Sequence, residues 1–186
     1  RFKAKAEFAK KPLFDVADEV GALKPGVILV HLTEARQDEL ERVARSGASV
    51  VFCPRSNLFI EGKLPPLLAA LKAGVDVALG TDSLASNISL DVLAEAKALA
   101  DRFPSVKADD LFTMATWNGA RALGRNDLGR IAKGARPGIY AVETSELIEH
   151  PSRWLLTHLS EPRRCVVART ALAAESARAP ITERSA

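Results

Sequence analysis

Three short apolar runs, each followed by an amphipathic stretch, constrain the fold of this chain more than any other feature. The runs are GVILVH at 26–31, ASVVFCP at 48–54 and VDVALG at 75–80. Continuous apolar runs of this length, rich in β-branched residues, are typical of strands buried on both faces. Strand starts about 22 and 27 residues apart leave room for one helix between neighbours. We therefore expect three parallel strands joined by right-handed crossovers.

Amphipathic stretches predict the helices that connect these strands. We expect helices over 35–47 and 64–74, since each stretch ends at a glycine that suits a helix C-terminus. A longer helix is expected over 88–103. Its apolar stripe consists of Ile88, Val92, Ala96 and Leu99.

The later part of the chain has a different pattern. Residues 108–124 predict one or two helices, whereas 136–143 and 163–170 predict separate short strands. The tail 171–186 is polar and rich in small residues, so we expect it to be disordered. The fold class is therefore α/β. Three βα units alone fit either a doubly wound sheet or part of a (β/α)₈ barrel.

Charge, hydropathy and cysteine usage exclude several classes of function. The formal net charge is +3 and the basic residues form no cluster, so we expect no nucleic-acid partner. No apolar run approaches the roughly 20 residues of a membrane span, and we expect no signal peptide. Cys53 and Cys165 lie far apart in apolar stretches, which favours buried free thiols over a disulfide. Together these features indicate a cytoplasmic soluble protein.

Polar side chains stand where each of the three strands ends. They are His31 after the first strand, Arg55, Ser56 and Asn57 after the second, and Asp82 and Ser83 after the third. In both architectures the active site lies beyond the carboxyl ends of the parallel strands. We therefore expect these side chains to gather at one rim of the sheet.

Each of these residues also has a structural interpretation. Taken alone, His31 is typical of a hydrogen-bonded structural histidine, and Asp82 of a helix cap or turn. The PRSN segment has the composition of a turn. Glu34 is expected to take part in helix-start contacts. His150 and His158 have no metal-ligand partners at familiar spacing, so we interpret them as structural.

The combination favours a metal site over these separate interpretations. Imidazole and carboxylate groups are ordinary ligands of a catalytic zinc ion, which activates water near neutral pH. A catalytic triad of Ser83, His31 and Asp82 is less consistent, because no G-x-S-x-G motif is present. An adjacent Asp and Ser also do not easily reach opposite sides of one imidazole.

Several ordered motifs resemble the amidohydrolase superfamily. They are HLTEARQDELERVARSGASVVFCPRSN, LLAALKAGVDVALGTDSLASNISLDVLAEAK, ATWNGARALG and LGRIAKGARPGIYAVE. More narrowly, they are similar to its branch of cyclic deaminases and chlorohydrolases, and most of all to aminofutalosine and adenosylhomocysteine deaminases. This resemblance implies strands 6–8 of a metal-dependent (β/α)₈ barrel over 1–135, followed by a segment of a small β-sandwich over 136–170.

The resemblance also implies a role for each strand-end residue. His31 matches the strand 6 histidine that contacts substrate and assists proton transfer. Asp82 matches the strand 8 aspartate that binds the metal and acts as general base. Arg55, Ser56 and Asn57 would shape the substrate rim, and Ser83 would line the loop after strand 8. The implied cofactor is a divalent metal, zinc in the first place, with iron also compatible.

Other family ligands have no counterpart in this sequence. The H-x-H pair of strand 1 and the strand 5 histidine are both missing. HLTEA superficially resembles the strand 5 motif, but its distance from CPRSN fits strand 6 better. We therefore expect the C-terminal portion of a barrel, from a truncated gene, a fragment or a subunit whose first half is a separate chain. With unpaired sheet edges, such a chain is expected to be marginally stable or to associate.

The function expected for the parent protein is hydrolysis of a C–N bond other than a peptide bond. Deamination of an adenine-type nucleoside or related heteroaromatic amidine is the first choice. A triazine-type chlorohydrolase or a cyclic amidase is one alternative, and a non-catalytic remnant or interaction subunit is another. The expected partners are a small-molecule substrate, the missing half of the barrel and, by resemblance, a second copy of the protein.

Overall fold

The computed structural model describes residues 11–159 and 163–167. Its central element is one parallel sheet in the order β1-β2-β3. The strands are β1 (Ile28–Val30), β2 (Ser49–Phe52) and β3 (Val77–Leu79). Val30 pairs with Val51, which in turn pairs with Ala78. The predicted α/β class and the three parallel strands are confirmed, although each strand is shorter than its apolar run.

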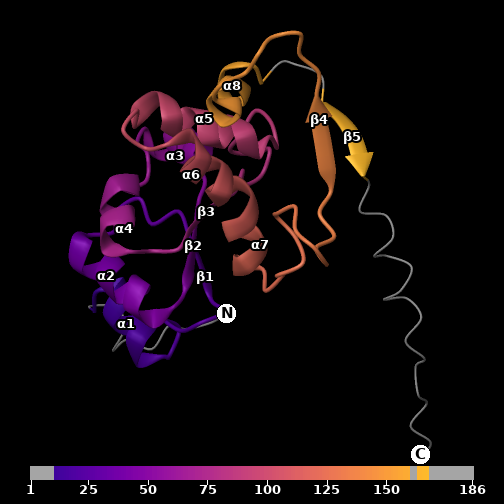
Figure 1. The fold of residues 1–186 in the computed structure, drawn as a ribbon. Coiled ribbons are helices and arrows are strands. Elements are labelled where there is room, and N and C mark those ends of the chain that lie inside the picture. Colours follow the sequence, from indigo (N-terminus) through magenta and orange to yellow (C-terminus); the bar gives the residue numbers. More distant parts are fainter. Residues whose placement is uncertain (1–10, 160–162, 168–186) are drawn as a thin grey trace, which may run out of the picture.

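Helices connect the strands and cover the sheet (Figure 1). They are α1 (Leu13–Glu19), α2 (Gln37–Ser46), α3 (Pro54–Glu61), α4 (Leu67–Ala73), α5 (Val92–Arg102), α6 (Ala108–Thr113), the π-helical turn η1 (Met114–Asn118), α7 (Gly119–Ala122) and α8 (Pro151–Thr157). In Figure 1, α2 and α4 lie on one side of the three strands. None of the helices in the described part of the chain is long and apolar enough to cross a membrane.

The hydrophobic core fills the space between the sheet and these helices. On α2, the apolar face predicted from the sequence buries Leu40 and Val43. The helix ends at Ser46 and is capped by Gly47, whose φ of 72° is left-handed. Side chains with 0% exposure include Leu40, Val43, Val50, Phe52, Leu67, Leu99 and Leu111. Burial of each such side chain contributes about 1.5–3 kcal/mol. The core thereby fixes the strands that carry the strand-end residues.

Two predictions about helix starts were wrong. PRSN is not a turn, and the apolar stripe of the long helix does not begin at Ile88. PRSN opens α3, with Pro54 at the first helical position, where its missing N–H costs no hydrogen bond. Ile88 is 88% exposed, because α5 begins only at Val92. The side chain of Asp91 accepts a hydrogen bond from the N–H of Leu93 at 3.0 Å. This cap sets the start of α5.

A second, two-stranded sheet follows the helices. It pairs β4 (Ile139–Val142) with β5 (Arg163–Val167) in antiparallel register, so both late strands are confirmed. Arg163 connects this sheet to α5 through an ion pair between its Nη2 and Asp91 Oδ2 at 2.8 Å. The division into a barrel part (1–135) and a β-sandwich segment (136–170) stays a prediction. The tail 171–186 lies outside the described residues.

Each outer edge of the parallel sheet lacks a strand neighbour among the described residues. At the β3 edge, the side chain of Asn118 donates a hydrogen bond to the carbonyl oxygen of Val77 at 2.7 Å. At the β1 edge, Val30 is 46% exposed. Unpaired edges that carry apolar side chains favour pairing with further strands. Marginal stability or association of the isolated chain therefore stays a prediction.

Gly129 gives a stability test, because its loop lies against the backbone of η1. Its φ is 75°, and a Cβ added there would stand 2.6 Å from the Thr116 carbonyl oxygen. Gly62 has a similar φ of 69° but nothing within 4 Å. We expect Gly62→Ala to cost about 1–2 kcal/mol for the left-handed backbone, and Gly129→Ala to cost about 1–3 kcal/mol more for the overlap. Urea unfolding measures both, and equal losses would contradict the close approach.

Candidate functional site

Two of the sequence-predicted residues face each other where β1 and β3 end. His31 Nε2 lies 4.0 Å from Asp82 Oδ2, and the two side chains are 36% and 34% exposed. Both residues have positive φ, 71° for His31 and 56° for Asp82. Among the described non-glycine residues only Leu32, next to His31, shares this conformation. Backbone strain of this kind costs about 1–3 kcal/mol per residue and is concentrated at functional sites.

Two buried serines hold the Asp82 carboxylate. The Ser56 and Ser86 hydroxyl oxygens each lie 2.9 Å from Asp82 Oδ2 and 2.8 Å from each other. Because each serine has one proton, two of these three short contacts carry a hydrogen bond at any moment. Ser56 comes from α3 and Ser86 from the loop after β3. One carboxylate oxygen therefore joins the ends of two strands.

The same contacts set the ionisation of Asp82. Hydrogen bonds from Ser56 and then Ser86 hold the pKa of the Asp82 carboxyl below its usual value. The backbone N–H of Ser83 adds to this effect, and the His31 ring makes a smaller contribution of the same sign. Hydrogen bonds to the charged form favour that form. Asp82 is therefore an anion at neutral pH.

Asn57 contacts the ring of His31 through its side-chain amide. Its Nδ2 lies 3.0 Å from His31 Nδ1, so the amide donates and the neutral ring carries its proton on Nε2. That N–H is on the side of Asp82. The Asn57 Oδ1 atom is buried without a hydrogen-bond partner among the described residues. The residue that contacts the histidine thus carries one unsatisfied buried polar atom.

The four residues predicted to contact substrate occupy two different environments. Ser56 and Asn57 are 0% and 1% exposed, bonded to the site residues rather than facing solvent. The Arg55 side chain donates to Ser89 Oγ at 3.0 Å and remains 18% exposed. Ser83 is exposed, and its hydroxyl accepts from the Ala85 N–H at 3.2 Å. Arg55 and Ser83 are therefore the two that remain open to a ligand.

Sequence reasoning missed Glu95, a fully buried carboxylate on α5. It accepts hydrogen bonds from the Arg55 backbone N–H at 2.8 Å and from Asn87 Nδ2 at 2.7 Å. Burial raises its pKa, while the Arg55 N–H and Asn87 act in the opposite direction. One signal could have found it: Glu95 falls on the apolar face of its helix, between Val92 and Leu99. A charge on that face needs partners.

Cys53 lies next to this network but has the properties of a structural thiol. It is free and buried, as predicted, and burial raises its pKa to about 11, with the Asp82 charge as a second cause. A thiol of that pKa is not a nucleophile at neutral pH. The side chain of Cys165 lies outside the described residues.

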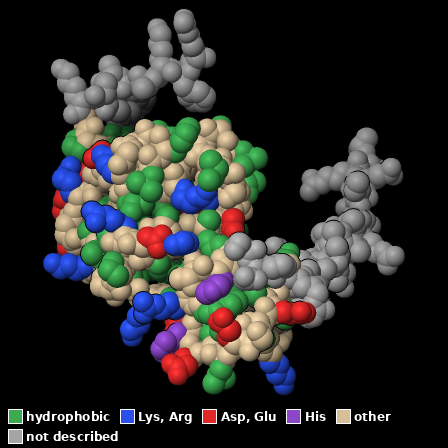
Figure 2. Space-filling view, turned by 90° about the horizontal axis from the view of Figure 1, so that it is seen from above, with side chains coloured by type: hydrophobic (Ala, Val, Ile, Leu, Met, Phe, Trp, Pro, Cys, Tyr) green, Lys and Arg blue, Asp and Glu red, His purple; other side chains and the backbone are tan. Residues whose placement is uncertain are grey.

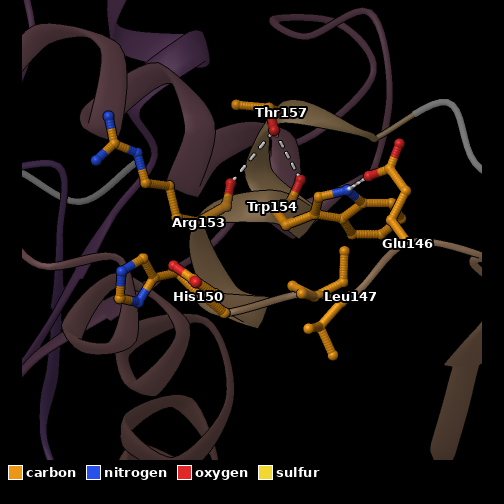
Figure 3. Close-up of a pocket in the computed structure, with 8 residues that line it drawn as sticks. Glu146, Leu147, His150, Arg153, Trp154 and Thr157 are labelled. Carbon is orange, nitrogen blue, oxygen red and sulfur yellow. Dashed lines mark hydrogen bonds between the residues drawn. The ribbon is translucent and has the colours of Figure 1, made fainter.

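The remaining predicted structural residues make contacts of their own. Glu34 forms an exposed ion pair with Lys63, a contact different from the helix-start contacts we expected. The ring of His158 stacks on Trp154, with ring centroids 4.3 Å apart. His150 precedes α8 and lines an open surface pocket there (Figure 3).

That pocket has the character of an ordinary surface hollow. In Figure 3, Trp154 Nε1 donates to Glu146 at 3.1 Å and Thr157 donates to the Trp154 carbonyl oxygen at 2.8 Å. These polar groups satisfy one another, and none of them belongs to the strand ends. On the face shown in Figure 2, the basic side chains are scattered among hydrophobic and acidic ones.

A divalent metal fits the donor types of the strand-end site, but two donors are too few to hold it. Asp82 supplies an anionic oxygen and His31 an imidazole nitrogen, which are ordinary zinc ligands. Within 11–159 and 163–167, no three His, Cys, Asp or Glu side chains gather as a metal-binding group. A metal bound here would therefore need further ligands from outside the described residues.

Parallel βα units with polar residues at their strand ends define an α/β protein whose site lies at the carboxyl edge of the sheet. Within this class, the model of the amidohydrolase family matches residues 2–174. The chain therefore belongs to the amidohydrolase family, which confirms the resemblance of its motifs.

Known proteins support this assignment over part of their length. The 5-methylthioadenosine/S-adenosylhomocysteine deaminase of Teredinibacter turnerae is 39% identical over 153 residues, which cover 78% of this chain and 34% of that protein. An adenosine deaminase from Xanthomonas campestris, solved with bound zinc, is 34% identical with a TM-score of 0.70, covering 83% and 37% of the two chains.

A third similarity concerns the fold alone. The atrazine chlorohydrolase TrzN of Arthrobacter aurescens TC1, solved with zinc, has a TM-score of 0.73 at 23% identity, over 81% of this chain and 36% of the other. The chain spans about a third of the length of the curated relatives it matches.

The serine contacts give a pH-dependent prediction. Ser56→Ala removes the largest cause of the low pKa of Asp82, so that pKa should rise toward its usual value. A lowered carboxyl pKa stabilises the folded state above the unfolded pKa, and this contribution is lost as the pH falls through the folded pKa. The variant should therefore be less stable by about 1 kcal/mol near pH 7, with a smaller difference below about pH 4.

Unfolding by urea across this pH range measures the difference. Ser83→Ala is the matched control, because Ser83 acts on Asp82 through its backbone N–H and not through its hydroxyl. A stability loss for Ser56→Ala that is the same at pH 7 and pH 3 would show that the serine does not act through the ionised carboxylate.

Proposed function

We propose that this chain is the C-terminal part, strands 6–8 with a β-sandwich segment, of a metal-dependent amidohydrolase that deaminates an adenine-type nucleoside by hydrolysis. One observation carries the proposal: His31 and Asp82 face each other at two strand ends, and the buried Ser56 and Asn57 hold them there. The deaminase names of the relatives support the substrate class.

Each site residue has a chemical task in this reaction. Hydrolytic deamination adds the oxygen of water to a ring carbon and releases the amino group as ammonia. Asp82, an anion at neutral pH, accepts the proton of the attacking water and returns it to the leaving amino group. His31, with its proton on Nε2, donates a hydrogen bond to the atom on which charge develops. Arg55 and Ser83 bind the substrate at the rim.

A divalent metal, when bound, activates the attacking water, and Asp82 is the residue of this chain that would ligate it. Zinc is our first choice because two of the similar structures were solved with zinc, and iron remains compatible with the same ligand types. Since Asp82 also accepts hydrogen bonds from two serines, its orientation is set before a metal binds.

The remaining ligands are proposed to come from the rest of the amidohydrolase fold. The exposed Val30 and the edge of β1 would pair with further strands of that fold. The free, buried thiol of Cys53 supports a reducing, cytoplasmic location. A non-catalytic subunit is the second candidate, because the described residues alone gather no metal-binding group.

A chimera separates these candidates. The segment of the Teredinibacter turnerae deaminase that matches this chain is replaced by the residues of this chain. We expect the chimera to copurify with zinc and to release ammonia from 5-methylthioadenosine or S-adenosylhomocysteine. Asp82→Asn in the chimera should lower kcat by about 10²–10⁴, because the mutant side chain cannot take the proton of water.

Control assays define what would contradict the proposal. Lys72→Gln, an exposed change in the last turn of α4, which precedes the opposite end of β3, should leave kcat unchanged. A folded chimera that releases chloride from atrazine but no ammonia from nucleosides would favour the chlorohydrolase alternative. A folded chimera without zinc, in which Asp82→Asn changes nothing, would favour the non-catalytic subunit.

A further inference from the structure

Glu95 carries the buried carboxylate that the proposed mechanism does not use. It belongs to α5, has 0% exposure, and has a hydrogen-bond partner on each of its oxygens. A buried carboxylate loses several kcal/mol of hydration, which only close partners offset. Its placement therefore calls for an explanation beyond filling space in the core.

The two partners of Glu95 belong to the two segments that form the site. Oε2 accepts from the backbone N–H of Arg55 in the first turn of α3, where helical N–H groups have no partner within the helix. Oε1 accepts from the side chain of Asn87, which also donates to the carbonyl oxygen of Thr81. Thr81 is the residue before Asp82, and Arg55 is the residue before Ser56.

We propose that Glu95 is a positioning residue that joins the start of α3 to the loop after β3, and so keeps His31 and Asp82 in register. On one side it fixes the turn that presents Ser56 and Asn57, and on the other the loop that presents Asp82. The positioning rests on contacts in this chain. Only its effect on turnover rests on the proposed function.

Glutamine cannot replace this carboxylate. Both oxygens of Glu95 accept from N–H donors, so the side-chain amide introduced by Glu95→Gln must turn its NH₂ group toward one of these donors in either orientation. The Arg55 guanidinium, with Nη1 3.8 Å from Oε1, also loses its ionic partner. An isosteric change should therefore separate the two segments while the volume of the core stays the same.

The test uses the histidine signals of this chain, which contains three histidines. With ¹⁵N-labelled histidine, the His31 ring should show an unprotonated Nδ1 and a protonated Nε2 in the wild type. Glu95→Gln should shift or broaden the His31 signals and leave those of His150 and His158 in place. His31→Gln assigns the signals.

Leu99→Val is the matched control on the same helix. Leu99 is fully buried one turn after Glu95, and the change costs stability without touching the hydrogen-bond network. It should leave the His31 signals unchanged. A folded Glu95→Gln protein with wild-type His31 signals, or a Leu99→Val protein that shifts them equally, would overturn the proposal.

A double variant tests the proposal in a background that should tolerate Glu95→Gln better. In Asn87→Ala the donor opposite Oε1 is gone, so adding Glu95→Gln should alter the His31 signals much less than it does in the wild type. If Glu95→Gln fails to fold in both backgrounds, Glu95 determines the fold rather than the site geometry, and the positioning proposal fails.

Turnover is measured separately in the chimera. Glu95→Gln should lower kcat about tenfold or more, as small misplacements of catalytic groups do, with KM changed less than twofold and the zinc content lowered. If the chimera is inactive in all forms while the His31 signals respond as expected, the proposed function fails and the positioning role stands. If the chimera is active and insensitive to Glu95→Gln, the effect on turnover is contradicted.

Discussion

Parallel pairing of three short strands is the constraint on which the rest of this structure depends. The His31 N–H donates to the Val51 carbonyl oxygen at 3.0 Å, and the Gly80 N–H donates to Phe52 at 2.9 Å, so the last hydrogen bonds of the sheet stand side by side. Just beyond them the chain turns with positive φ at His31 and again at Asp82. His31 and Asp82, 51 positions apart in the sequence, thereby face each other at one edge of the sheet.

The strands and most helices could be predicted because their signals are local. An apolar run of six or seven residues indicates a buried strand by itself, and an amphipathic stretch that ends at a glycine indicates a helix and where it stops. The start of α3 was not predictable in this way. Pro54 suits a turn and a first helical turn equally. The interaction that holds the helix start joins Arg55 to Glu95, 40 residues later in the sequence. The composition of the residues around Pro54 cannot indicate a contact with a residue so far along the chain.

The residues of the candidate site could be predicted where they directly follow a strand, and not where they lie further along the chain. His31 and Asp82 follow apolar strands, so the rule that sites lie at the carboxyl edge selects them. The same rule selects Ser56 and Asn57. It predicts which edge of the sheet a residue occupies but not how deeply its side chain is buried, so it does not show that these two side chains have almost no exposure to solvent. Ser86 lies in the loop after β3, four residues beyond Asp82, and Glu95 lies on α5, away from the strand ends in the sequence. Of these, only Glu95 leaves a sequence signal, a charge on an apolar helix face.

Asp82 and Glu95 occupy opposite environments, which suits the different roles proposed for them. Asp82 stands at the partly open mouth, and hydroxyl donors lower its pKa, whereas Glu95 lies in the core, where burial raises its pKa. A carboxylate with a lowered pKa is a dependable anion but a weak base. It takes a proton from water only where that water is itself made acidic, which is the chemistry that a divalent metal supplies. In the reaction proposed above, Asp82 would act as the anion beside a metal-activated water, and Glu95, fully buried on α5, would hold the geometry.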